Sequence, residues 1–173
     1  MKYADVKENT TITVADTEFI VLEKQKDRVF CLTRNLAFKN KQFDKNSNNY
    51  AISDVKEKLD KEFLPKLVEA VGADNILDVD IDLTSDDGLD DYGSVKDKIG
   101  LLTDSMYRKY NRIIENYPVR NGWWLATPYS TPHRGYSALV RCVNLVGTLG
   151  DDVCFRNYGF RPFCIFSSAI FES

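Results

Sequence analysis

The sequence predicts an α+β fold, in which strands from both ends of the chain meet in one antiparallel sheet and two helices lie between them. β-branched and aromatic residues dominate residues 11–33 and return after residue 122, whereas helical apolar spacing is confined to the middle of the chain. With 173 residues and 43% apolar content, the chain is long enough for one core and short for two. We therefore expect a single domain over residues 1–173.

Near the N-terminus, three short runs have the composition of strands. They cover residues 11–14, 18–23 and 28–33, with a turn at residues 15–17, and they predict a small meander. Residues 39–49 are rich in Asn and Lys and have few apolar side chains. This segment is expected to be a surface loop.

A first helix is expected to begin after Ser53, whose hydroxyl suits an N-cap. Its apolar face repeats every four residues through Val55, Leu59, Phe63, Leu67 and Val71. Pro65 lacks a backbone N–H, so we expect a break or kink near Leu64, unless a second short helix begins there.

A second helix is expected to begin after Thr103 and to end before Pro118. Its predicted apolar face consists of Met106, Tyr110, Ile113 and Ile114. Strands are predicted on either side of it, at residues 99–102, 123–126, 138–143, 153–156 and 160–166.

Both tryptophans of the chain, Trp123 and Trp124, lie side by side in an apolar run. Such a pair is expected on a buried strand of the core. Arg161 follows in a second aromatic motif, Tyr-Gly-Phe-Arg-Pro-Phe at residues 158–163. We expect its guanidinium to have a structural role, holding backbone carbonyls or a carboxylate near the end of the sheet.

Four motifs in order resemble the bacterial domain-of-unknown-function family 6273. They are the strand meander, Asp-Lys-Ile-Gly-Leu-Leu-Thr at residues 97–103, Trp-Trp-Leu-x-x-Pro at 123–128 and Gly-Phe-Arg-Pro at 159–162. The resemblance implies a C-type-lectin-like fold, which is also that of formylglycine-generating enzymes, and an origin in gut Firmicutes, phages or mobile elements. Ala126 stands where the family usually has Arg, so a contact made by that arginine is not expected here.

The net charge of −3 hides an uneven distribution along the chain. Residues 74–91 contain eight aspartates and no basic residue, a field that repels nucleic acid and attracts a cation or a basic protein. The segment lacks the calcium loop pattern, and the lectin signatures Glu-Pro-Asn and Trp-Asn-Asp are absent from the chain. The main expectation is a solvated acidic loop without metal. Two alternatives remain open: the segment binds a cation, or Asp86, Asp87, Asp90 and Asp91 form a docking face for a basic protein.

The sequence contains no clear catalytic motif. His133 is the single histidine and lies in a Pro-rich loop without the strand–turn–helix elbow of a hydrolase. The four cysteines fall in apolar runs without Cys-x-x-Cys spacing, which predicts buried reduced thiols instead of a disulfide framework, a zinc site or a copper-binding oxidase pair. We expect no enzyme activity and no cofactor.

The better candidates for recognition are aromatic and basic side chains of the C-terminal loops, because Tyr and Arg are enriched at binding hot spots. These candidates are Tyr129, His133, Arg134, Tyr136, Arg156, Asn157 and Tyr158. The leading hypothesis is a binding module for a protein or glycan ligand, with no direct contact to nucleic acid or membrane. The alternative is a phage or mobile-element inhibitor of a host nucleic-acid machine, similar to an anti-CRISPR protein, acting through the acidic segment. The N-terminus has no signal-peptide pattern, so a cytoplasmic location is expected.

Overall fold

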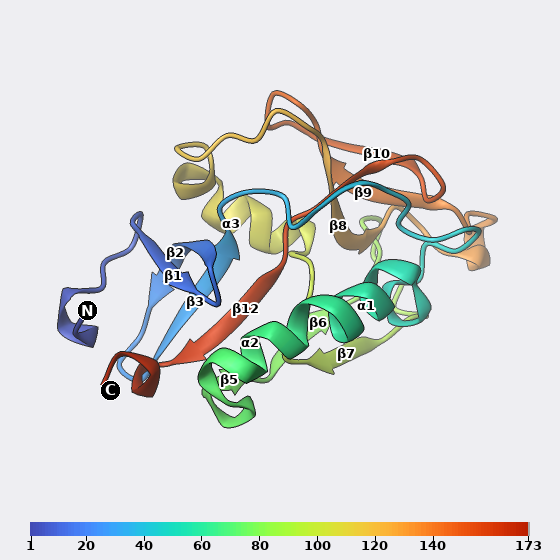
Figure 1. Cartoon of the computed structure of the whole chain (residues 1–173). Helices are drawn as coiled ribbons and strands as arrows, with labels where there is room; N and C mark the ends of the chain where they lie inside the picture. Colours follow the sequence, from blue (N-terminus) through green and yellow to red (C-terminus); the bar gives the residue numbers. More distant parts are fainter. Residues whose placement is uncertain (173) are drawn as a thin grey trace.

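The computed structural model describes residues 1–172 and is a mixed α+β structure (Figure 1). The expected meander is confirmed as β1 (Thr11–Val14), β2 (Thr17–Lys24) and β3 (Arg28–Thr33). Ala15 and Asp16 both have positive φ, 51° and 58°, in the two-residue turn between β1 and β2. Two successive left-handed residues match the right-handed twist of the hairpin strands that they connect.

The first sheet has the strand order β1-β2-β3-β12-β5, so a C-terminal strand lies inside the N-terminal sheet. β12 (Phe163–Ser167) runs antiparallel between β3 and the short strand β5 (Ile76–Leu77). The two ends of the chain therefore lie near each other (Figure 1). The expectation that terminal strands share an antiparallel sheet is confirmed for β12.

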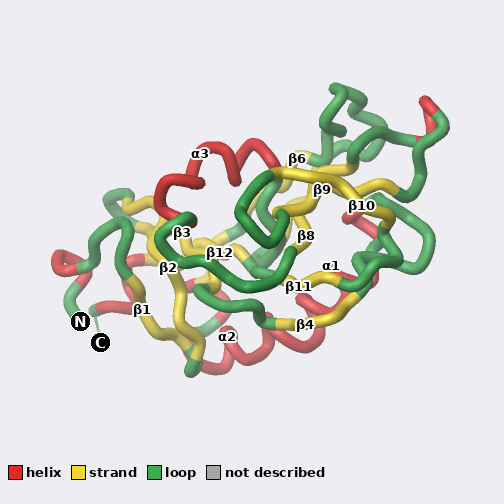
Figure 2. The backbone as a smooth tube through the Cα atoms, turned by 90° about the horizontal axis from the view of Figure 1, so that it is seen from above, coloured by secondary structure: helices red, strands yellow, loops and turns green. Residues whose placement is uncertain are grey.

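The other C-terminal strands form a second sheet, in the order β10-β9-β8-β11-β4. The bounds are β8 (Trp123–Pro128), β9 (Leu139–Val143), β10 (Leu149–Val153), β11 (Tyr158–Phe160) and β4 (Phe38–Lys41). β11 pairs with β8 in parallel, so the expectation of one purely antiparallel sheet was wrong. Figure 2 shows this second sheet from above, beside the first.

Two strand predictions near the C-terminus need correction. Residues 160–166 are divided between β11 and β12, which belong to different sheets, because the chain leaves the ladder at Arg161 and Pro162. Residues 154–157 form a turn after β10, where a strand was expected.

The first helical segment begins as expected, with the Ser53 hydroxyl accepting a hydrogen bond from Lys56 N. It consists of α1 (Asp54–Lys58), a π-helical turn η3 (Leu59–Phe63) and α2 (Leu64–Val71). The wider turn immediately precedes Pro65, which cannot donate to the preceding turn. Apolar residues spaced by exactly four drift around an ideal α-helix, and the π turn brings Leu59, Phe63 and Leu67 back to one buried side.

The second helix, α3 (Asp104–Ile114), is capped by Thr103, whose hydroxyl accepts from Met106 N. Tyr110 and Ile114 are buried as expected, and Tyr107 joins them although its position was not on the predicted face. Short 3-10 turns complete the helical elements: η1 (Tyr3–Asp5), η2 (Tyr50–Ile52), η4 (Ala73–Asn75), η5 (Pro132–Arg134) and η6 (Ser168–Phe171).

The acidic segment is more ordered than the sequence indicated. β6 (Val79–Asp82) and β7 (Ser94–Asp97) form a two-stranded antiparallel hairpin, with the aspartate-rich loop at its end. The predicted strand at residues 99–102 is wrong, since only Gly100 is bridged there, to Phe163. Val and Ile alternate with Asp in β6, and this alternation is typical of a strand. The high charge of the segment led to the prediction of a loop instead.

Residues 39–49 are not a surface loop throughout, which corrects the prediction. Part of the segment belongs to β4, and Phe43 and Asn48 are fully buried. Phe43 packs edge-on against Trp124, with 5.8 Å between ring centroids. The polar composition of residues 39–49 gave no indication that these two side chains are buried.

The core is centred on β8, in which all six residues are buried. Trp123 and Trp124 are 1% and 0% exposed and point to opposite faces of the strand, as the alternation of a strand requires. Trp123 packs against Tyr107 of α3, and Trp124 packs against Tyr158. One face of β8 therefore packs against α3, and the other face packs toward β4 and β11.

Candidate functional site

The C-terminal loop over residues 129–137, called here the Tyr–His–Arg loop, is a compact turn and not a free excursion. Its middle is the 3-10 turn η5, which ends at Gly135 with φ of 82°. Tyr129 and Tyr136 pack edge to face at its base, with ring centroids 5.4 Å apart. His133, Arg134 and Tyr136 are exposed on the outside of this turn.

The acidic segment holds the Tyr–His–Arg loop directly. Asp87 Oδ2 accepts hydrogen bonds from Ser130 Oγ at 2.7 Å and from Arg134 Nη1 at 3.0 Å. The Thr131 hydroxyl donates to Asp91. The hydrogen bonds from Ser85 and Ser130 lower the pKa of Asp87, so it is ionised at neutral pH. Asp87 and Asp91, two of the four residues of the proposed acidic docking face, therefore contact the Tyr–His–Arg loop directly.

Asp86 faces the opposite side of the acidic loop, toward α3 and β9. Its carboxylate lies 3.6 Å from Arg108 Nη2 and 3.8 Å from Arg141 Nε, and Arg141 Nε lies 3.9 Å from Asp104 Oδ2. Burial, together with the neighbouring Asp86 carboxylate, raises the pKa of Asp104 to about 6. Asp90 makes no side-chain hydrogen bond or ion pair within residues 1–172 and is exposed.

Asn48 is the residue of this region that sequence reasoning missed. Its buried side-chain amide donates to the carbonyls of Ser130 and Leu139, at 2.9 and 3.0 Å, and its Oδ1 accepts from the Tyr92 hydroxyl at 2.7 Å. Asn48 therefore ties both ends of the Tyr–His–Arg loop to the acidic hairpin. An asparagine in an Asn- and Lys-rich run carries no sequence signal for this role.

Of the other three candidate ligand residues, Arg156 and Asn157 follow the turn after β10, and Tyr158 begins β11. The ring of Tyr158 packs against Trp124 with centroids 4.7 Å apart, and its hydroxyl donates to Asp152 at 2.7 Å, which is a packing role. Arg156 is exposed and lies 3.8 Å from Asp152, while Asn157 lines a separate open groove beside α1. No hydrogen bond or ion pair among residues 1–172 joins these side chains to the Tyr–His–Arg loop.

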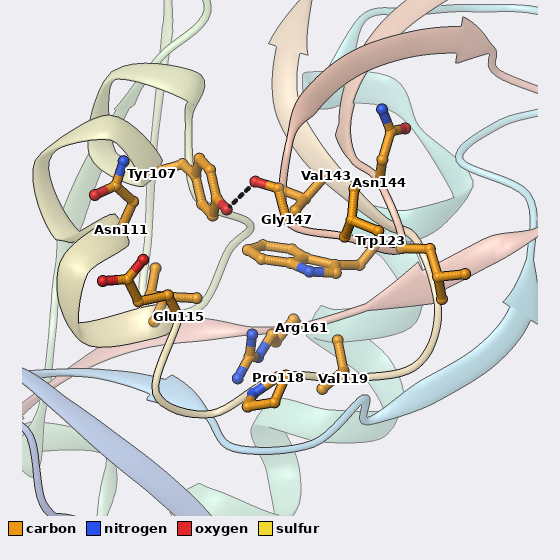
Figure 3. A pocket seen from close by; sticks show the side chains of 13 residues that line it. Tyr107, Asn111, Glu115, Pro118, Val119, Trp123, Val143, Asn144, Gly147 and Arg161 are labelled. Carbon is orange, nitrogen blue, oxygen red and sulfur yellow. Dashed lines mark hydrogen bonds between the residues drawn. The ribbon is translucent and has the colours of Figure 1, made fainter.

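A cavity of about 270 Å³ lies beneath the opposite end of the second sheet, between α3 and the turn that connects β9 to β10 (Figure 3). Its inner side is formed by Trp123, Tyr107 and Arg161. The Tyr107 hydroxyl donates to the carbonyl of Gly147 at 2.5 Å and so holds the turn over the cavity. Leu145 and Val146, at the tip of this turn, are 64% and 82% exposed.

Arg161 is 1% exposed, which is exceptional for a charged side chain. Nε donates to the carbonyl of Thr33 at 2.8 Å, and Nη2 donates to the carbonyls of Arg34 and Tyr117, both at 2.9 Å. Burial lowers the pKa of Arg161 to about 10, so it keeps its proton at neutral pH. The side chain joins the break between β11 and β12 to the end of β3 and to the segment after α3.

The arrangement holds no familiar catalytic set within the described residues. His133 makes no side-chain hydrogen bond to residues 1–172, and no group of three His, Cys, Asp or Glu in that range is placed to bind a metal ion. All four cysteines are buried and free, and burial raises the pKa of Cys142 to about 11. Cys31 and Cys164 face each other across β3 and β12, both deep in the core.

Comparisons with known proteins add no identity: no family model, no curated protein and no solved structure matches the chain. Within residues 1–172, no helix is long and apolar enough to cross a bilayer.

Proposed function

We propose that the protein is a non-catalytic binding module that presents the Tyr–His–Arg loop to a protein or glycan ligand. The observation that carries the proposal is the bracing of this loop. Three hydroxyl or guanidinium donors of the loop bind Asp87 and Asp91, and Asn48 binds the backbone at both of its ends. A loop held in one conformation loses little entropy on binding, so more of the contact energy appears as affinity.

The exposed side chains fit this role. His133 and Arg134 offer polar contacts, and Tyr136 is 43% exposed while its ring rests on Tyr129. A rigid aromatic anchor beside an arginine is the usual composition of a binding hot spot. Asp87 and Asp91 bind the loop through their carboxylates, so these two residues of the acidic segment support its conformation.

We propose in addition that the fold is of the C-type-lectin-like kind and that the chain belongs with domain-of-unknown-function family 6273. The insertion of β12 between β3 and β5, which brings the chain ends together, supports this assignment, as does the buried Trp-Trp strand beside the arginine motif. A long excursion between terminal strands carries the Tyr–His–Arg loop away from the chain ends (Figure 1).

The test compares three variants of the immobilised protein on a glycan array and in pull-downs from bacterial lysate. The loop variant carries His133→Ser and Tyr136→Ser, the acidic variant carries Asp90→Asn, and the control carries Arg112→Ala on an exposed arginine of α3. We expect the loop variant to lose at least tenfold in affinity and the other two to bind normally. Loss by Asp90→Asn with retention by the loop variant would instead support an acidic docking face for a basic partner.

A further inference from the structure

The guanidinium of Arg161 has more donors than partners. Nε and Nη2 are occupied by three backbone carbonyls, whereas Nη1 has no hydrogen-bond partner among residues 1–172. No carboxylate in that range forms an ion pair with Arg161. A buried cation without a countercharge is costly, and neutral carbonyls compensate it only in part. The side chain also lines the cavity drawn in Figure 3.

The contacts of Arg161 restrict how a ligand can reach its charge. The Trp123 indole lies against the guanidinium, 5.3 Å from Cζ to the ring centroid, and so covers one face of it. The Nε and Nη2 edges are blocked by the carbonyls that they bind. The two N–H groups of Nη1 are therefore the part of Arg161 that is left for a molecule in the cavity.

We propose that this cavity is a binding site for a small organic anion, with a carboxylate at Nη1 of Arg161 and an apolar body against Val119, Leu145 and Val146. A carboxylate accepts charge-assisted hydrogen bonds from arginine and supplies the missing countercharge. The two residues at the tip of the β9–β10 turn are highly exposed apolar side chains, and a ligand in the cavity would cover them. The volume of about 270 Å³ is just below the usual range for drug-sized ligands, which indicates a molecule built on a single ring.

Glu115 also lines the cavity, where it contributes a negative charge. Its side chain is 58% exposed, and its carboxylate lies 3.6 Å from Arg112 Nη1. This negative charge opposes an anionic ligand but would favour a cationic one. Removing it therefore has opposite effects on the two kinds of ligand, and the sign of the change identifies which kind binds.

Benzoate and its neutral analogue benzamide are suitable probes for the whole chain. Binding is measured by isothermal titration calorimetry and by the fluorescence of the tryptophans, since Trp123 lines the cavity. We expect benzoate to bind at least tenfold more tightly than benzamide. Equal binding of the two probes, or no saturable binding of benzoate up to about 10 mM, would overturn the proposal.

Three variants test the position of the site. Val119→Phe places a larger side chain in the cavity and should abolish benzoate binding, whereas Glu115→Gln should strengthen benzoate binding about twofold. Arg161→Lys keeps the positive charge but loses the forked arrangement of N–H donors. The folding of this variant is checked by circular dichroism. If Arg161→Lys does not fold, Val119→Phe still tests the site. Unchanged benzoate binding in Val119→Phe, or weaker binding in Glu115→Gln, would refute the assignment.

This site is separate from the Tyr–His–Arg loop, so the two proposals can fail independently. Tyr136→Ser should leave benzoate binding unchanged, and Val119→Phe should leave binding through the loop unchanged. If Tyr136→Ser instead removed benzoate binding, the probe would be bound at the loop and the cavity proposal would be wrong.

Discussion

Asp87 and Arg134 form an ion pair, with 3.0 Å between Oδ2 and Nη1, that joins the acidic hairpin loop to the Tyr–His–Arg loop. The two residues come from segments that the sequence analysis treated as competing binding surfaces. Their contact makes a substitution at Asp87 a change to both surfaces at once. Asp90, which has no such contact, is the residue that separates the two hypotheses.

The contribution of Asp87 to the stability of the loop can be measured by substituting its two partners in the loop, Ser130 and Arg134. We expect Ser130→Ala to lower the free energy of unfolding by about 1 kcal/mol, because the buried hydroxyl donates to a charged acceptor. Arg134→Ala should cost less than about 0.5 kcal/mol, since its side chain is 54% exposed and the pair is screened by solvent. Urea unfolding of both variants checks this order, and a larger loss for Arg134→Ala would contradict it.

Asn48 is expected to be among the most sensitive polar positions of the chain. Asn48→Ala removes two donors and one acceptor and leaves the carbonyl of Ser130 without the amide that it binds, whereas the carbonyl of Leu139 keeps its hydrogen bond from Tyr129 N. We expect a loss of about 2–4 kcal/mol. Tyr92→Phe removes only the third hydrogen bond and should cost about 1 kcal/mol. Thermal and urea unfolding measure both values. Equal small losses would show that the amide is not a structural anchor.

The paired tryptophans should each contribute strongly to stability. Trp123→Ala and Trp124→Ala remove fully buried indoles, and each is expected to cost about 3–5 kcal/mol. Trp124→Phe should cost less, because a smaller ring still packs against Phe43 and Tyr158. Losses below about 1 kcal/mol in urea unfolding of either alanine variant would mean that β8 is not the centre of the core.

Stability should depend on pH through Asp104, whose pKa is raised to about 6. A raised carboxyl pKa means that the folded state binds more protons than the unfolded state between about pH 4 and pH 6, so the stability falls as the pH rises through this window. Asp104→Asn mimics the protonated form and should not show this fall. We expect the variant to gain roughly 1–3 kcal/mol relative to the native protein between pH 4 and pH 7.

Unfolding by urea at several pH values checks this prediction. Asp86→Asn is the useful companion variant, because it removes the neighbouring carboxylate that raises the pKa of Asp104. A difference between Asp104→Asn and the native protein that does not vary with pH would show that Asp104 titrates normally in the folded chain.

The elements that depend on local signals could be predicted from the sequence. Alternation of β-branched residues placed β1 to β3, and hydroxyl caps at Ser53 and Thr103 placed the starts of both helices. These signals act within a few residues: a cap binds an N–H two or three positions away, and a strand alternates with a period of two. Adjacent tryptophans in an apolar run likewise indicated the buried strand.

Tertiary structure alone decided how the elements combine and where the candidate sites lie. Nothing local indicates that β11 pairs in parallel with β8, that Asn48 is buried beneath a loop eighty residues away, or that Asp87 is bound to Arg134. Arg161 likewise reaches the cavity because carbonyls from distant segments of the chain hold its guanidinium beside Trp123. Sequence patterns report hydrophobic period and capping, whereas the pairing of polar groups over long distances depends on which chain segments the common core brings together.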